Sequence, residues 1–178
     1  MLSDLAFIDL LSGGDRRSLG NANQVADIVL ARASRVEELL ACCLVQETEI
    51  RSRASHALMT IARRKDDLLQ PHTAFLLQKL MTIPQWEVRS HLCQTITLLK
   101  LDKEEIDRLV EILAEFLADK SSIVRTCAMQ AMVDLCGQSP GLVHMVRPVI
   151  ADRTISGTAA MRARGRQLLK VLDRDFPN

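Results

Sequence analysis

Apolar residues recur along the chain with a helical period, and this pattern is itself repeated. Four segments open with an apolar residue followed by an arginine: Arg51, Arg89, Arg125 and Arg162. These arginines lie 38, 36 and 37 residues apart. The residue before each arginine, and those three, seven and ten positions after it, are apolar or small, as in Val88, Leu92, Ile96 and Leu99. This spacing places one apolar band on one face of a helix, repeated four times.

A second helical pattern precedes each band. Twelve residues before each arginine stands another apolar residue: Leu39, Leu77, Leu113 and Ile150. Ser34 with Glu37 and Asp102 with Glu105 have the spacing of capping boxes, Ser121 is a candidate N-cap, and Ser139 precedes a first-turn proline. We therefore predict helix pairs at about 35–45 and 50–64, 71–82 and 86–100, 103–118 and 122–136, and 140–151 and 158–173, after an opening pair near 2–12 and 18–32.

A repeat of two helices over about 37 residues is near both the tetratricopeptide and the HEAT class. The Trp and Tyr positions of the tetratricopeptide signature are missing, whereas an apolar residue and Arg opening the second helix resemble the HEAT family. The interval from Asp119 to Arg125 resembles the family's Asp and Arg pair, although the other three repeats lack that Asp. The segments 13–20, 86–89, 119–125 and 161–166 resemble a group of small bacterial HEAT-repeat proteins, a likeness that implies a fold and no activity.

The resemblance implies an all-α fold, namely a right-handed α-α superhelix of the HEAT or armadillo type with about five antiparallel helix pairs. One helix pair cannot bury its apolar band alone, so neighbouring pairs stack into one core. We expect a single solenoid domain over residues 1–178. It would comprise capping helices at 1–33 and repeats at about 34–69, 70–101, 102–138 and 139–176.

Composition supports a helical protein without a strong overall charge. Hydrophobic residues make up 48% of the chain but aromatic residues only 3%, whereas sheets favour aromatic and β-branched residues. The net charge of +1 excludes a global attraction to nucleic acid or an anionic membrane. The apolar run from Leu39 to Val45 is too short to span a bilayer. The five cysteines have no metal-ligand spacing, so we expect free core thiols and a cytoplasmic location.

The second helices supply the candidate partner surface. In HEAT arrays they line the concave side, and helical phase turns positions one, five, eight and twelve after each arginine outward, among them Met59, Ser90 and Val133. The position five after each arginine forms the clearest column: His56, Gln94, Gln130 and Gln167. Glutamine amides both donate and accept, so such a column suits a bound peptide or helix. Trp86 is a candidate anchor for that partner. A solvated polar face, with Trp86 packed on a neighbouring helix, is the alternative.

Two groups of residues are candidates for anion binding. Gly13 and Gly14 precede Arg16 and Arg17, which joins a flexible turn to two guanidinium groups. The second group is the arginine ladder, defined as Arg51, Arg89, Arg125 and Arg162. Structural alternatives are favoured for both: the glycines end the first helix and Asp15 caps the next, and the ladder pairs with carboxylates such as Glu49, Glu87 or Asp119. The basic residues of the last repeat, including Arg164, Arg166, Lys170 and Arg174, are read as a polar cap.

No catalytic, metal-binding or cofactor-binding pattern stands out. HEAT-type hydroxylases use His-Glu dipeptides, and none of the four histidines precedes a Glu. HEAT-like alkylpurine DNA glycosylases surround an Asp with aromatic residues, which are scarce here. The sequence therefore predicts a noncatalytic scaffold that binds a peptide or helix on its concave face. The alternative is nucleic-acid or phosphate binding through a local basic patch, in a protein related in fold to those glycosylases. The oligomeric state stays open.

Overall fold

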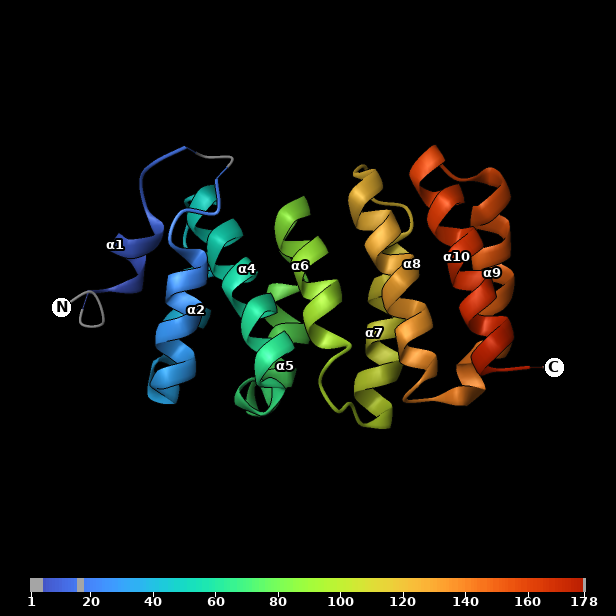
Figure 1. Ribbon diagram of the computed structural model, residues 1–178, viewed down its shortest axis with the longest axis horizontal. Helices are drawn as coiled ribbons and strands as arrows, with labels where there is room; N and C mark the ends of the chain where they lie inside the picture. Colours follow the sequence, from blue (N-terminus) through green and yellow to red (C-terminus); the bar gives the residue numbers. More distant parts are fainter. Residues whose placement is uncertain (1–4, 16–17, 178) are drawn as a thin grey trace. The chain divides into compact units, whose positions relative to one another are not determined.

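The computed structural model describes residues 5–15 and 18–177. Over these residues every regular element is a helix and no strand occurs (Figure 1), which confirms the predicted all-α class. The chain divides into two compact units, Met1–Leu99 and Lys100–Asn178. This division falls close to the predicted boundary between repeats at 101 and 102.

The first unit is built around the long helix α4. This helix packs against three elements that precede it and one that follows: α1 (Phe7–Leu11), α2 (Ala22–Ala31), α3 (Val36–Cys42) and α6 (Trp86–Ile96), with α4 itself spanning Thr48–Arg64. Short helical segments complete the unit: η2 (Ala33–Arg35), η3 (Asp66–Leu68), η4 (Gln70–His72), α5 (Thr73–Phe75) and η5 (Leu76–Leu80). Helix α6 also packs against η5, which stands where a first helix was expected.

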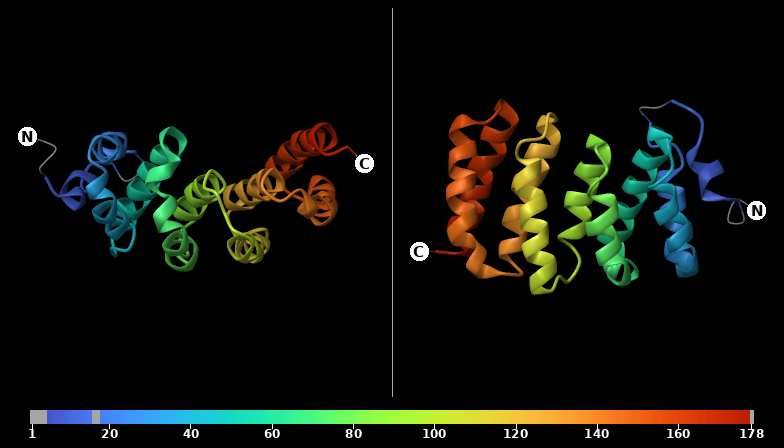
Figure 2. Two further views of the ribbon diagram at one scale, coloured as in Figure 1. Left: turned by 90° about the horizontal axis from the view of Figure 1, so that it is seen from below. Right: turned by 180° about the vertical axis from the view of Figure 1, so that it is seen from behind.

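The second unit consists of two helical hairpins. The first joins α7 (Lys103–Phe116) to α8 (Ser122–Cys136), and the second joins α9 (Val143–Ser156) to α10 (Ala159–Asp175) after the short turn η6 (Pro140–Leu142). Helix α8 packs against α7, α9 and α10. Within this unit, α8 and α10 form one layer, and α7 and α9 form the other (Figure 2).

The predicted apolar bands form the core. In α4, in α6 and the turn after it, and in α8, all twelve band positions are at most 4% exposed: Ile50, Ala54, Leu58, Ile61, Val88, Leu92, Ile96, Leu99, Val124, Ala128, Met132 and Leu135. The first-helix residues Leu39, Leu77, Leu113 and Ile150 are buried as well. Leu169, the third band position of α10, is only half-buried. The band is therefore confirmed, except at this position in the last helix.

One of the two predicted capping boxes forms. Asp102 accepts from the backbone N–H of Glu105 at 2.9 Å, and the Glu105 carboxylate accepts from the N–H of Asp102 at 3.0 Å. The box at Ser34 was wrong, because Ser34 lies inside the 3-10 turn η2 and α3 begins at Val36 without a side-chain cap. Ser121 caps α8 as predicted.

Several predicted boundaries were too wide. The helix expected at 71–82 is divided into η4, α5 and the π-helical segment η5, where the N–H of Met81 donates to the carbonyl of Leu76. The helix expected at 86–100 ends at Ile96, and tight turns follow. The helix expected at 18–32 begins only at Ala22. Before Ala22, four backbone carbonyls accept hydrogen bonds from the side chain of Arg53. Helical hydrogen bonds therefore do not extend through this segment.

Candidate functional site

The predicted column five positions after each arginine lies on the second helices. His56 and Gln94 are half-buried on α4 and α6 of the first unit, Gln130 is half-buried on α8, and Gln167 is exposed on α10. Three other positions predicted to face outward are buried, namely Met59, Ser90 and Val133. They are buried because a second helix is covered by neighbouring second helices as well as by its own partner, so its buried face is wider than one apolar band.

Side chains from α4 and α6 meet on the surface of the first unit. The rings of His56 and His91 pack edge to face, with centroids 5.3 Å apart. Nη2 of Arg63 donates to Oε1 of Gln94 at 2.6 Å. We refer to His56, Arg63, His91 and Gln94 as the α4–α6 cluster. The sequence identified His56 and Gln94 in the column and Arg63 as an outward-facing position, but not His91, because the cross-helix distances are set by packing.

Both histidines of this cluster are poor bases. The pKa of His91 is lowered to about 4, mainly by burial and in smaller part by the charges of His56 and Arg63. Burial also lowers the pKa of His56, and Arg63 adds to this effect. Desolvation and like charge both disfavour the imidazolium form. The two rings are therefore neutral at pH 7.

A second group of polar side chains spans α8 and α10. Nε2 of Gln130 donates to Oδ1 of Asp134 at 2.7 Å. Burial raises the pKa of Asp134, while the hydrogen bond from Gln130 and the charge of Arg164 on α10 oppose that rise. Nη1 of Arg164 also donates to Oε1 of Gln167 at 3.4 Å. We refer to Gln130, Asp134, Arg164 and Gln167 as the α8–α10 cluster.

The glutamines of the predicted column already have partners within their own units. Gln94 accepts from Arg63 and donates to the carbonyl of Ser90, Gln130 donates to Asp134, and Gln167 accepts from Arg164. A peptide that bound through these amides would exchange existing hydrogen bonds for new ones. The net gain from such an exchange is small, so recognition at these clusters depends more on charge and shape than on the glutamines alone.

Trp86 is the first residue of α6 and is 45% exposed. The residue before it, Gln85, is held in place by Nε of Arg51, which donates to its side chain at 2.8 Å, and by its own bond to the carbonyl of Thr48. The start of α6 is thus fixed to the start of α4. This arrangement leaves nearly half of the indole surface accessible on an anchored backbone.

The Gly-Gly turn surrounds a buried arginine that the sequence did not single out. Arg53 on α4 is 2% exposed, and its guanidinium donates to four backbone carbonyls at 2.6–3.2 Å: those of Leu11, Gly13, Asp15 and Ser18. Gly13 and Gly14 have φ of 71° and 73°, a conformation that favours glycine. The candidates Arg16 and Arg17 lie outside the described residues. The carbonyls of this segment therefore serve a structural purpose.

The arginine ladder stabilises the connections between paired helices. Arg51 donates to the carbonyl of Val45 at 3.0 Å, Arg89 to that of Ile83 at 3.1 Å, and Arg162 to that of Gly157 at 2.7 Å. Each acceptor lies five or six residues before its arginine, in the turn that leads into the second helix. Nε of Arg125 is buried and has no hydrogen-bond partner among the described residues. The sequence predicts carboxylates as the partners of the ladder, whereas Arg51, Arg89 and Arg162 donate to backbone carbonyls.

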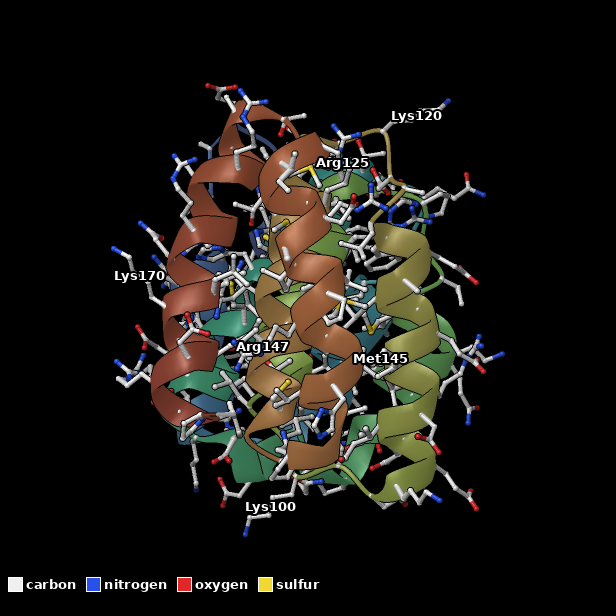
Figure 3. All side chains as sticks on the ribbon, turned by 90° about the vertical axis from the view of Figure 1, so that its right-hand side faces the viewer. Lys100, Lys120, Arg125, Met145, Arg147 and Lys170 are labelled. Carbon is white, nitrogen blue, oxygen red and sulfur yellow. The ribbon has the colours of Figure 1, made fainter. Side chains whose placement is uncertain are left out.

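Part of the basic charge of the last repeat is neutralised within the second unit. Arg147 pairs with Asp173 and donates to the carbonyls of Leu172 and Phe176, and Arg174 pairs with Asp175. In Figure 3, Arg147 lies between α9 and α10, whereas Lys170 on α10 points away from them. The patch available to an anion is therefore smaller than the sequence suggests.

A pocket of about 380 Å³ lies at one end of the second unit. Its wall is formed by the first turns of α9 and by the chain after α10, and it includes His144, Pro148, Phe176 and Arg147. The bond from Arg147 to the carbonyl of Phe176 fixes the chain end over α9. The sequence pattern does not predict this pocket, because the pocket depends on where Phe176 and Pro177 lie against the start of α9.

The cysteines are free and largely buried. Burial, helped by Glu38 for Cys42 and by Asp134 for Cys136, raises the pKa of both thiols to about 11. Burial raises that of Cys43 still further. Thiols rather than thiolates are present at neutral pH, and thiols are weak nucleophiles.

The described residues contain no group of three or more His, Cys, Asp or Glu side chains arranged to hold a metal ion. None of their helices combines the length and the apolar character needed to cross a bilayer. Comparisons with protein-family models, with curated proteins and with solved structures find no match to this chain, so its function has to be inferred from its own residues.

Proposed function

We propose that this chain is a HEAT-like repeat protein that binds a protein partner, without catalysis, through the exposed faces of its second helices. The repeated arginine and the apolar bands behind it, which are buried as a stacked repeat requires, support the repeat assignment. In this proposal the helix pairs continue as a right-handed superhelix, and the second helices line its concave side. The five free cysteines fit a reducing compartment such as the cytoplasm.

The observation that carries the proposal is the meeting of side chains from successive second helices. His56 and His91 come from different repeats and touch across α4 and α6. Within the second unit, the charge of Arg164 on α10 acts on Asp134 of α8. Each unit therefore carries one polar cluster on its second helices, and a bound peptide or helix would meet such a cluster.

Nucleic-acid or phosphate binding is the second candidate and has weaker support. Among the basic residues of the last repeat, Arg147 and Arg174 pair with carboxylates and Arg162 binds a backbone carbonyl. Lys170 and Arg166 are exposed and keep this alternative open. Binding to duplex DNA that weakens steeply with salt would favour it over the protein-binding proposal.

Selection from a library of displayed peptides tests the proposed function. Peptides that bind the purified chain should give amide shift changes, in NMR spectra of the labelled protein, at residues of the α4–α6 or α8–α10 cluster. Gln94→Ala combined with Gln130→Ala should weaken binding about threefold, since each replacement removes a polar partner with a small net contribution. Affinity is measured by calorimetry.

Matched control variants come from the first-helix layer. Gln78 on η5 and Asp107 on α7 are exposed, and Gln78→Ala combined with Asp107→Ala should leave the affinity unchanged. Shift changes confined to α7, α9 and η5, or equal losses for both pairs of variants, would contradict binding through the second helices. If none of the selected peptides binds the purified protein in solution, the proposal as a whole is contradicted.

A further inference from the structure

The α4–α6 cluster gathers three groups that can carry positive charge and contains no carboxylate. Arg63 carries its charge at every physiological pH, and it is exposed at the end of α4. One of its five N–H groups binds Gln94, which leaves others for an acceptor from outside. The half-buried rings of His56 and His91 lie edge to face beside it.

The hydrogen bonds of Ser55 decide which nitrogen of His91 is free. The Ser55 hydroxyl is fully buried and donates its single hydrogen to the carbonyl of Ser52 at 2.9 Å. Its oxygen lies 2.9 Å from Nδ1 of His91, and while the hydroxyl hydrogen is donated to Ser52, Nδ1 is the donor in that contact. Nε2 of His91 therefore carries the lone pair and is the atom that takes up a proton.

Carboxylates on the surrounding helices are engaged elsewhere or do not act on the rings. Asp27 on α2 pairs with Arg64, and Glu38 on α3 pairs with Arg35. By charge, Arg63 acts on both histidines, and His56 acts on His91. The pKa shifts of the two rings are not attributed to the other charged groups on elements packed against α4 or α6, which are Asp9, Glu37, Glu49, Arg51, Arg53, Asp66, Asp67, Lys79, Glu87 and Arg89.

We propose that the α4–α6 cluster binds the carboxylate of an acidic side chain in a peptide partner, and that the bound carboxylate favours protonation of an imidazole of the cluster. This inference rests on the proposed function, because it names the chemistry that the same surface recognises. The carboxylate accepts from Arg63, and as the pH falls it also accepts from the imidazolium that it favours. A single carboxylate matches the single fixed charge of the cluster, whereas neutral imidazoles offer a phosphate dianion less compensation.

Histidine ring NMR with a defined probe tests this inference. The probe is hexaglutamate, acetylated and amidated at its ends, and hexaglutamine is the uncharged control. Saturating hexaglutamate should raise the pKa of His91 or His56 by about one unit, because an opposite charge within a few ångströms favours the imidazolium. Affinity should accordingly be higher at pH 5.5 than at pH 7.5.

Two adjacent arginines provide a matched pair of variants. Arg63→Ala should weaken hexaglutamate binding about tenfold, while Arg64→Ala, which removes an exposed arginine paired with Asp27, should change it by less than about twofold. Both side chains are exposed, so neither replacement should unfold the protein. Equal effects of the two variants, unmoved histidine signals, or equal ring shifts with inorganic phosphate or hexaglutamine would overturn the inference. If selected peptides bind the second helices but are not acidic, this inference fails while the proposed function stands.

Discussion

Arg53 and Gly13, forty residues apart in the sequence, are joined by a partly buried hydrogen bond of 2.7 Å from Nη1 to the glycine carbonyl. Three more carbonyls of residues 11–18 accept from the same guanidinium. A buried cation is costly unless its donors are satisfied. The opening segment therefore depends on one side chain of α4 for its conformation, and that side chain depends on the segment for its solvation.

Replacing Arg53 should destabilise the protein strongly. Arg53→Met leaves the carbonyls of Leu11, Gly13 and Ser18 without this donor, while that of Asp15 keeps its bonds from Ser18, and we expect a loss of about 3 kcal/mol in the free energy of unfolding. Arg53→Lys should recover only part of it, because an ammonium group does not reproduce the planar guanidinium fork. Urea unfolding measures both. Arg64→Met on the exposed end of α4 should cost less than about 0.5 kcal/mol, and similar losses for both arginines would contradict this account.

Gly165 allows α10 to approach α9 closely. A Cβ at this position would lie 2.1 Å from Oγ1 of Thr154 and 3.2 Å from the methyl carbon of Met129. Gly165→Ala should therefore lower stability by about 2 kcal/mol despite the better helix propensity of alanine. Combining it with Thr154→Ala should restore part of the loss. Gly141→Ala, where an added Cβ meets no atom within 4 Å, is the control in thermal unfolding, and an equal loss there would rule out the steric explanation.

The two predicted capping boxes give a direct comparison. Asp102→Ala removes a cap with two reciprocal hydrogen bonds and should cost about 1 kcal/mol. Ser34→Ala should cost less than about 0.3 kcal/mol, because neither η2 nor α3 has a side-chain cap. Denaturant midpoints of the two variants test this difference. A loss of unfolding free energy for Ser34→Ala larger than that for Asp102→Ala would show that Ser34 does act as a helix cap.

Acid should weaken the protein partly through His91. Its pKa is lowered to about 4 in the folded state, against about 6.5 when unfolded. Between these values the unfolded chain binds a proton that the folded chain does not, so stability falls as pH drops from about 6.5 to 4, by an amount on the order of 2 kcal/mol. His91→Asn keeps a donor for Ser55 and should flatten the curve over this range. An identical pH dependence in both proteins would exclude this role.

The sequence alone determined that the described part of this chain is helical, that the apolar bands of the second helices are buried except at Leu169, and where Asp102 and Ser121 begin helices. These features follow from periodicity and short-range hydrogen bonds, in which all the partners lie within a few residues. Only the tertiary structure decided that the buried guanidinium of Arg53 donates to carbonyls between Leu11 and Ser18 and that the rings of His56 and His91 are in contact. It also decided that ladder arginines such as Arg51 donate to carbonyls in the turn before their helix. Such partners are chosen by the distance and rotation between packed helices, and these depend on side-chain volumes that no local pattern records.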